Sequence, residues 1–214
     1  MSQAAAGPNR QVREDHLGAS TFIEKGWYLI AQGEYPAAEN ALGTALGLAP
    51  SDLRAKSLLG WAVMRQGKYD DAMTILNGVL SIDPANGMAR ANLGYVQLRL
   101  GLVREAEETL RLAVQQSRDP KAALYGNFYL GLLHSSVSDC ARAQDFFAKS
   151  IALGPNFIEA YYELGRAHWV GGDEAAADRV WSEGNSANRF SLWGRRCAEA
   201  MRVVRAGLEP HGFS

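Results

Sequence analysis

Glycine recurs along this chain at a nearly constant interval. The first series is Gly26, Gly60, Gly94, Gly131 and Gly165, with steps of 34, 34, 37 and 34 residues. A series of alanines keeps the same four steps: Ala38, Ala72, Ala106, Ala143 and Ala177. Prolines close the first four units: Pro50, Pro84, Pro120 and Pro155. Agreement on one register over residues 19–189 predicts a repeat array, in which each unit packs on its neighbours.

The second unit shows what each repeat contains. Leu53 to Gln66 has helical spacing, Gly67-Lys68 interrupts it, and Tyr69 to Ile82 resumes it. Asp83-Pro84 then ends the unit, because proline lacks an amide proton and disfavours helix in the residue before it. Each unit is therefore predicted to be two antiparallel helices joined by a tight turn. A third glycine series marks that turn and skips the fourth unit: Gly33, Gly67, Gly101 and Gly172, with Ser138 in the remaining unit.

Glycine in the middle of the first helix requires a compensation, since it costs ~1 kcal/mol relative to alanine. We expect Gly60 to allow the second helix to approach closely, with the small Ala72 opposite it. The same geometry repeated five times generates a superhelix with a concave side.

These residues resemble the tetratricopeptide repeat (TPR) family, whose units carry a Leu-Gly pair in the first helix. The pairs here are Leu59-Gly60, Leu93-Gly94, Leu130-Gly131 and Leu164-Gly165, with Lys25-Gly26 a departure in the first unit. The resemblance implies an all-α fold, a right-handed superhelical α-solenoid of helix-turn-helix repeats. For function it implies protein–protein interaction and no more.

The repeats set the expected domain organisation. We expect a mobile tail over residues 1–18, repeats at about 19–52, 53–86, 87–123, 124–157 and 158–189, a capping helix over 190–207, and a tail over 208–214. The capping helix has an apolar stripe that includes Trp193, Cys197 and Met201, and arginines on its other side. Covering the exposed edge of the last repeat is the favoured role. Contact with an acidic partner or an anionic lipid is the alternative.

Composition and motifs exclude several classes of protein. The formal net charge of −1 argues against nucleic-acid binding. The chain lacks a stretch of ~20 apolar residues and the apolar core of a secretory signal, so we expect no membrane span and a cytoplasmic location. Phosphate loops, nucleophile elbows, His-Glu-x-x-His and Cys-x-x-Cys motifs are absent, so no enzymatic activity, cofactor or metal is expected. His134 and His168 occupy equivalent repeat positions and are interpreted as packed structural residues.

A second stripe on the first helix of each unit supplies the candidate binding residues, because the resemblance implies that this face lines the concave groove. The candidates are Ile23, Trp27, Ile30, Trp61, Met64, Arg65, Tyr95, Leu98, Arg99, Phe128, Leu132, Tyr162, Arg166 and Trp169. Trp27, Trp61 and Tyr95 occupy one repeat position and form an aromatic ladder, with Arg65 and Arg99 beside it. The rings either pack between first helices as core or form a groove for a partner's segment. We favour the groove, since so much ring surface should stay partly exposed.

The composition of this groove predicts the kind of partner. We expect a scaffold, adaptor or chaperone-like protein that holds an apolar peptide or helix with acidic flanks. A clamp for a terminal carboxylate is not expected, because bulky apolar residues stand where some family members carry Lys, Asn and Arg. The competing hypothesis is a structural subunit that docks through its convex face or its basic last helix. Oligomeric state does not follow from these features.

Overall fold

The structure is a computed structural model that describes residues 8–116 and 118–208, with side chains from Leu17 onward. The described residues form eleven α-helices and no strand. The helices are α1 (Pro8–Gln32), α2 (Tyr35–Leu48), α3 (Leu53–Arg65), α4 (Tyr69–Ile82), α5 (Gly87–Arg99), α6 (Val103–Gln116), α7 (Pro120–Ser136), α8 (Cys140–Leu153), α9 (Ile158–Val170), α10 (Glu174–Ala187) and α11 (Leu192–Arg205). The expected all-α class is confirmed.

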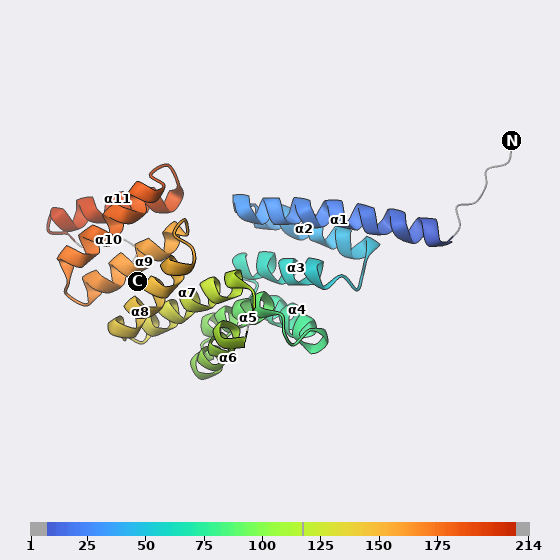
Figure 1. The fold of residues 1–214 in the computed structure, drawn as a ribbon, viewed down its shortest axis with the longest axis horizontal. Helices are drawn as coiled ribbons and strands as arrows, with labels where there is room; N and C mark the ends of the chain where they lie inside the picture. Colours follow the sequence, from blue (N-terminus) through green and yellow to red (C-terminus); the bar gives the residue numbers. More distant parts are fainter. Residues whose placement is uncertain (1–7, 117, 209–214) are drawn as a thin grey trace.

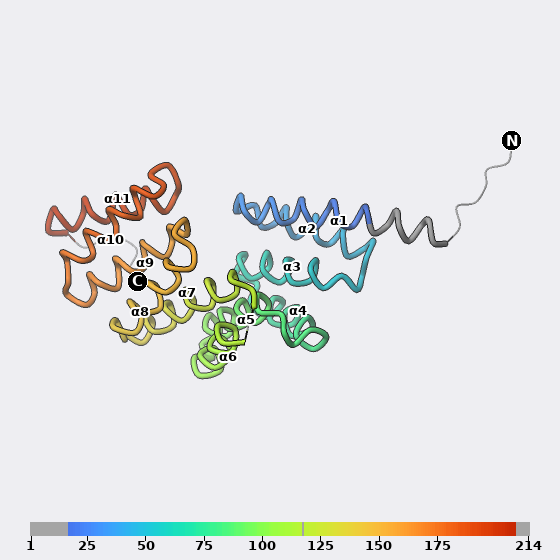
Figure 2. Tube along the Cα trace, in the orientation of Figure 1, coloured from blue at the N-terminus to red at the C-terminus, as the bar shows by residue number. Residues whose placement is uncertain are grey.

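Successive helices pack as antiparallel hairpins, and the hairpins stack in chain order (Figure 1). In the Cα trace the path descends from α1 to α6 and rises again through α7 to α11, so that the array curves as an arch (Figure 2). The first helices of the units, α1, α3, α5, α7 and α9, also pack on one another along this curve. This is the expected α-solenoid.

The repeat glycine receives a side chain from the second helix of its own unit. A Cβ built on Gly60 would lie 2.7 Å from Leu76 Cδ2, and one on Gly131 would lie 2.5 Å from Phe147 Cδ1. The residue that fills the space comes four positions after the repeat alanine in every unit, and all five are fully buried: Leu42, Leu76, Leu110, Phe147 and Trp181. The compensation for glycine is therefore a large apolar side chain inserted against the helix backbone.

Tight turns join the two helices of each unit, and four of them use glycine with a positive φ. The fourth unit reaches the same left-handed conformation with Ser138, whose φ is 58°. The turn geometry is thus kept where the glycine series is interrupted, although a Cβ is disfavoured in this region of backbone conformation.

Two helices begin earlier than the expected unit boundaries. α1 starts at Pro8, so residues 8–18, which we expected in a mobile tail, are helical. Proline is compatible with the first turn of a helix, where its missing amide proton is not needed. α7 starts at Pro120 after the N-cap Asp119, whose side chain accepts from Lys121 N. The longer join before the fourth unit is therefore an additional turn of helix. The expected tails at 1–7 and 209–214 lie outside the described residues.

α11 follows α9 at the repeat interval and takes the place of a sixth first helix. It packs on α10 and α9, and it buries Cys197, Ala200 and Met201 in a cluster with Trp181. Arg205 of α11 forms an ion pair with Asp178 of α10 at 2.7 Å. The helix thereby covers the apolar edge of the fifth unit.

Candidate partner-binding surface

We call the surface formed by the first helices, which pack on one another, the inner surface, and the candidate residues on it divide by exposure. Five are buried in the core between helices: Ile23, Ile30, Trp61, Met64 and Phe128. Seven are half-buried: Trp27, Tyr95, Leu98, Leu132, Tyr162, Arg166 and Trp169. Arg65 and Arg99 are exposed. Part of the aromatic stripe therefore supports the array, and the remainder stays accessible to a partner.

Two tyrosines of α7 pack against the aromatic ladder. Trp27 and Trp61 lie 5.7 Å apart, but Tyr125 of α7 packs edge-on against Trp61 at 5.4 Å. Tyr95 instead contacts Tyr129 at 4.6 Å, and Tyr125 and Tyr129 lie 6.0 Å apart. Sequence reasoning missed both tyrosines although they lie inside the expected fourth unit, because the stripe selected other repeat positions, those of Phe128 and Leu132. The Asp119-Pro120 pair, an N-cap followed by a first-turn proline, is the sequence signal for the earlier start of α7.

A hollow of about 530 Å³ opens beside this cluster, and we call it the N-terminal hollow. It is lined by Glu24, Trp27, Leu53, Arg54, Ser57, Leu58, Trp61, Asp83, Asn86, Met88, Asn92, Asp119, Lys121 and Tyr125. Two charged groups on its wall are already engaged. Arg54 bonds Glu24 at 2.7 Å, and the Lys121 ammonium lies 4.5 Å from the Trp27 ring centroid.

A smaller central hollow of about 240 Å³ lies further along the inner surface. It is lined by Met64, Arg65, Tyr69, Tyr95, Arg99, Phe128, Tyr129, Leu132 and Glu159. Arg99 donates to the Tyr95 hydroxyl at 2.9 Å and lies 4.9 Å from the Tyr69 ring. Arg65 lies 5.2 Å from the Tyr35 ring. The two arginines are therefore held in place by aromatic rings at the edge of the hollow.

Electrostatics in the central hollow involve an acidic residue that the sequence reasoning missed. Burial raises the pKa of the Glu159 carboxyl to about 7, and the nearby Arg65 guanidinium offsets only part of that effect. Desolvation is the largest single effect on the pKa of Arg65 and lowers it, but Glu159 and three nearby tyrosines together raise the pKa above its usual value. The charge of this hollow consequently depends on pH near neutrality.

The C-terminal end of the inner surface is built from α9 and α11. Tyr162 and Trp193 lie 5.3 Å apart, and Arg196 lies 4.5 Å from the Trp193 ring. Arg166 donates to Glu163 at 2.8 Å. Polar groups here are paired within the surface, so this end offers mainly half-buried rings.

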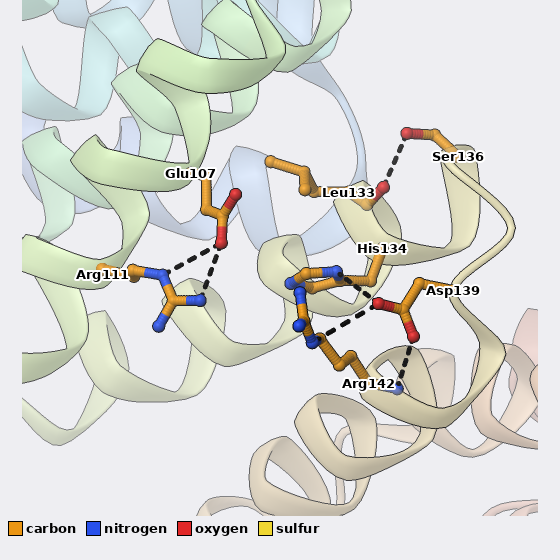
Figure 3. A network of polar contacts seen from close by, with 7 residues as sticks. All are labelled: Glu107, Arg111, Leu133, His134, Ser136, Asp139 and Arg142. Atoms are coloured by element: carbon orange, nitrogen blue, oxygen red, sulfur yellow. Dashed lines mark hydrogen bonds and ion pairs between the residues drawn. The ribbon is translucent and has the colours of Figure 1, made fainter.

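His134 lies away from the inner surface, between α7 and α8 (Figure 3). Its ring stacks on Phe146 with centroids 5.3 Å apart, and its Nδ1 lies 3.7 Å from Asp139 Oδ2. Arg142 Nε approaches the same carboxylate oxygen at 3.4 Å, as Figure 3 shows. Burial lowers the pKa of His134 and, likewise, of His168. The packed environment of His134 agrees with a structural role.

Within residues 8–116 and 118–208, His, Cys, Asp and Glu side chains do not gather in groups of three that could hold a metal ion. Cys140 and Cys197 are free thiols, and burial raises the pKa of Cys197 to about 12. None of the helices in the described part of the chain has the length and apolarity needed to cross a bilayer.

Comparison with known proteins agrees with this architecture. Models of the tetratricopeptide repeat match residues 23–87, 63–126 and 158–183. No curated protein is significantly similar to the chain in sequence.

Solved structures share the fold at low sequence identity. A thermophilic TPR protein of Thermus thermophilus, TTC0263, is 18% identical with a TM-score of 0.77, covering 86% of this chain and 99% of its own. The pilF protein of Pseudomonas aeruginosa is 19% identical with a TM-score of 0.67, covering 90% and 86%. YrrB, described as a TPR protein with an unusual peptide-binding site, is 20% identical with a TM-score of 0.53, covering 91% and 99%.

Proposed function

Because the chain belongs to the tetratricopeptide repeat family, we propose that it is a non-enzymatic interaction module that holds a segment of a partner protein on its inner surface. TPR proteins generally mediate protein–protein interactions. The proposed role is that of a scaffold, adaptor or chaperone-like binder, and the segment is an apolar peptide or helix. The observation that carries the proposal is the inner surface itself. Its two hollows are bordered by half-buried aromatic rings and by arginines that contact Glu24 or tyrosine rings.

Several features support binding on this face. The half-buried Leu98, Leu132 and Tyr162 keep apolar surface accessible on three successive first helices. Pre-positioned rings and arginines are common energetic centres of protein interfaces. Arg99 is held by Tyr69 and Tyr95, so less side-chain entropy is lost when a partner binds. YrrB, one structural neighbour, is described as having a peptide-binding site.

One observation favours a different docking surface. Phe190, which precedes α11, and Leu192, its first residue, are 76% and 53% exposed, and Arg195 of the same helix is also exposed. A structural subunit that docks through its last helix would use such residues. This second candidate predicts contact outside the arch and leaves the inner surface free.

Site-specific photo-crosslinking separates the two candidates. A benzophenone amino acid replaces Leu98 or Leu132 on the inner surface, Thr74 on the exposed side of α4, or Leu192 on α11. We expect the positions on the inner surface to form covalent adducts with the same partner in native extracts, identified by mass spectrometry. Adducts formed only from Thr74 or Leu192 would overturn the proposal and favour the second candidate.

A further inference from the structure

Three aromatic rings on the wall of the N-terminal hollow are set at angles to one another. The Trp27 and Trp61 centroids lie 5.7 Å apart with their planes inclined by 57°, and Tyr125 meets Trp61 at 5.4 Å and 70°. All three residues line the hollow. The face of an aromatic ring carries the negative end of its quadrupole and attracts a cation within about 6 Å of the centroid. A wall built from such rings therefore favours a positively charged group.

The chain itself already places a cation against this wall. The Nζ atom of Lys121 lies 4.5 Å from the Trp27 centroid, inside the ~6 Å limit for a cation–π contact. Lys121 is an exposed residue of α7, whereas Trp27 lies on α1. The contact shows that the wall accommodates an ammonium group.

The charged residues around the rings leave one negative charge unbalanced. The carboxylates of Glu24, Asp83 and Asp119 line the hollow against the two cations Arg54 and Lys121. Arg54 bonds Glu24 at 2.7 Å, so the remaining charges are two carboxylates and one ammonium. One further positive charge would balance the hollow, whereas a negative charge would be repelled.

A buried carboxamide adds an acceptor to the same wall. Asn92 lines the hollow and is 1% exposed, and neither polar atom of its carboxamide has a hydrogen-bond partner among the described residues. Buried polar atoms are paired in the great majority of cases, and a bound group that carries N–H can supply a donor to Oδ1. An ammonium with N–H bonds therefore suits the hollow better than a fully methylated one.

We propose that the N-terminal hollow binds the ammonium group of a lysine side chain in the partner's segment, through its aromatic wall and the carboxylates of Asp83 and Asp119. The inference rests on the proposed function and names one residue type of the bound segment. The four-carbon stem of lysine adds apolar surface that can contact the rings. At about 530 Å³ the hollow lies within the ~300–1,000 Å³ typical of ligand sites.

The test uses Nα-acetyl-lysine methylamide as the probe and Nα-acetyl-norleucine methylamide, which lacks the charge, as its control. Each is titrated at low salt into the full ¹⁵N-labelled chain. The indole ¹⁵N–¹H signals of Trp27 and Trp61, assigned from Trp27→Phe and Trp61→Phe, are followed. We expect saturable shifts of both signals with the lysine compound and at least about threefold weaker binding of the norleucine compound. Equal binding of the two compounds, or no shift with the lysine compound, would overturn the proposal.

Variants that change one charge test the assigned groups. Asp83→Asn and Asp119→Asn should each weaken binding of the lysine compound by at least about threefold, because each removes an attracting charge. Asparagine can accept the same backbone hydrogen bonds, so the local fold is kept. The matched control is Asp71→Asn, an exposed carboxylate on α4 that does not line the hollow. Equal effects of Asp71→Asn and the two hollow variants would overturn the proposal.

Lys121→Met provides a change of opposite sign. Removing the ammonium removes a like charge and leaves the Trp27 ring open to the probe, so binding of the lysine compound should become at least about threefold tighter. A lysine that only supports the fold would not give this gain. Unchanged or weaker binding by Lys121→Met would overturn the proposal.

These readouts separate the inference from the proposed function. If the lysine compound fails to bind while Leu98 and Leu132 form photo-crosslinked adducts, the inference is overturned and the proposed function stands. If Leu98 and Leu132 form no adducts, the proposed function fails, and the inference that rests on it fails with it.

Discussion

The ammonium of Lys121 lies 4.5 Å from the centroid of the Trp27 indole, and this contact joins the fourth unit to the first. Lys121 belongs to the additional turn of α7, while Trp27 lies on α1, three hairpins earlier. Most contacts in a solenoid connect adjacent repeats, whereas this contact spans three units and borders the N-terminal hollow. It also places an aromatic ring and a cation on the wall of that hollow.

The Lys121–Trp27 contact should contribute a small but measurable coupling energy. We expect Lys121→Met and Trp27→Leu to be non-additive, with a coupling of about 0.5–1 kcal/mol, as found for exposed cation–π pairs. The measurement is a double-mutant cycle by urea denaturation. Strict additivity of the two substitutions would show that the ammonium and the ring do not interact in solution.

Filling the space above a repeat glycine should destabilise the hairpin. A Cβ on Gly131 would lie 2.5 Å from two ring carbons of the fully buried Phe147, so Gly131→Ala should cost about 1–3 kcal/mol of unfolding free energy. The matched control is Gly78→Ala in α4, where nothing lies within 4 Å of the new Cβ. That substitution should stabilise the protein by about 0.5–1 kcal/mol through helix propensity. Equal effects at the two sites in thermal and urea unfolding would contradict this packing account.

The repeat architecture could be predicted because each unit repeats the same local constraints. Glycine spacing, turn glycines and closing prolines all report on backbone geometry within one hairpin, and the family resemblance added the superhelix. The occupant of the glycine space was not predicted, because Leu76, Phe147 and Trp181 differ in kind and share only a repeat position. The start of α7 at Pro120 was not predicted, because the fourth unit was expected to begin at residue 124, inside the helix.

The candidate surface was harder to predict from the sequence than the repeat architecture. A helical stripe identifies residues near the inner face, but whether Trp61 is buried and Trp27 half-buried depends on Tyr125, which arrives from another unit. The raised pKa of Glu159 depends on which neighbours surround it in three dimensions. Glu159 is not part of the repeat motif, so a single sequence gives no reason to select it.

Relief of backbone strain in the fourth turn should stabilise the protein. Ser138 adopts φ 58°, a left-handed conformation that the other turns reach with glycine. Ser138→Gly removes the Cβ that this conformation disfavours and should raise the unfolding free energy by about 1 kcal/mol. The reciprocal change, Gly172→Ser in the equivalent turn, should lower it by a similar amount. Thermal unfolding of both variants is sufficient, and a destabilised Ser138→Gly would refute the strain argument.

The half-buried Glu159 carboxyl should make stability depend on pH near neutrality. Its pKa rises from 4.5 to about 7, chiefly through burial, so the folded state holds a proton that the unfolded state has released between those values. Stability from this group therefore falls as pH rises from about 4.5 to about 7 and is constant above that range. Glu159→Gln should be more stable than the wild type above pH 7, by on the order of 1–2 kcal/mol, and the difference should vanish below pH 4.5.

Glu39 provides a control of opposite sign for this pH dependence. A hydrogen bond from Lys68, assisted by one from Gln66, lowers the pKa of the Glu39 carboxyl below its usual range. Its contribution to stability is present above the unfolded pKa of 4.5 and is lost as pH falls through the lower folded value. Glu39→Gln should therefore be less stable than the wild type at pH 7, with the difference shrinking in acid. Urea unfolding of both variants from pH 4 to pH 8 should give stability differences of opposite sign. Ionised Glu159 destabilises the folded state because it is desolvated, whereas ionised Glu39 stabilises it through its bonds to Lys68 and Gln66. Curves of the same sign would mean that the attraction to Arg65 fully offsets the cost of burying the Glu159 carboxylate. The charge of the central hollow would then stay constant across neutral pH.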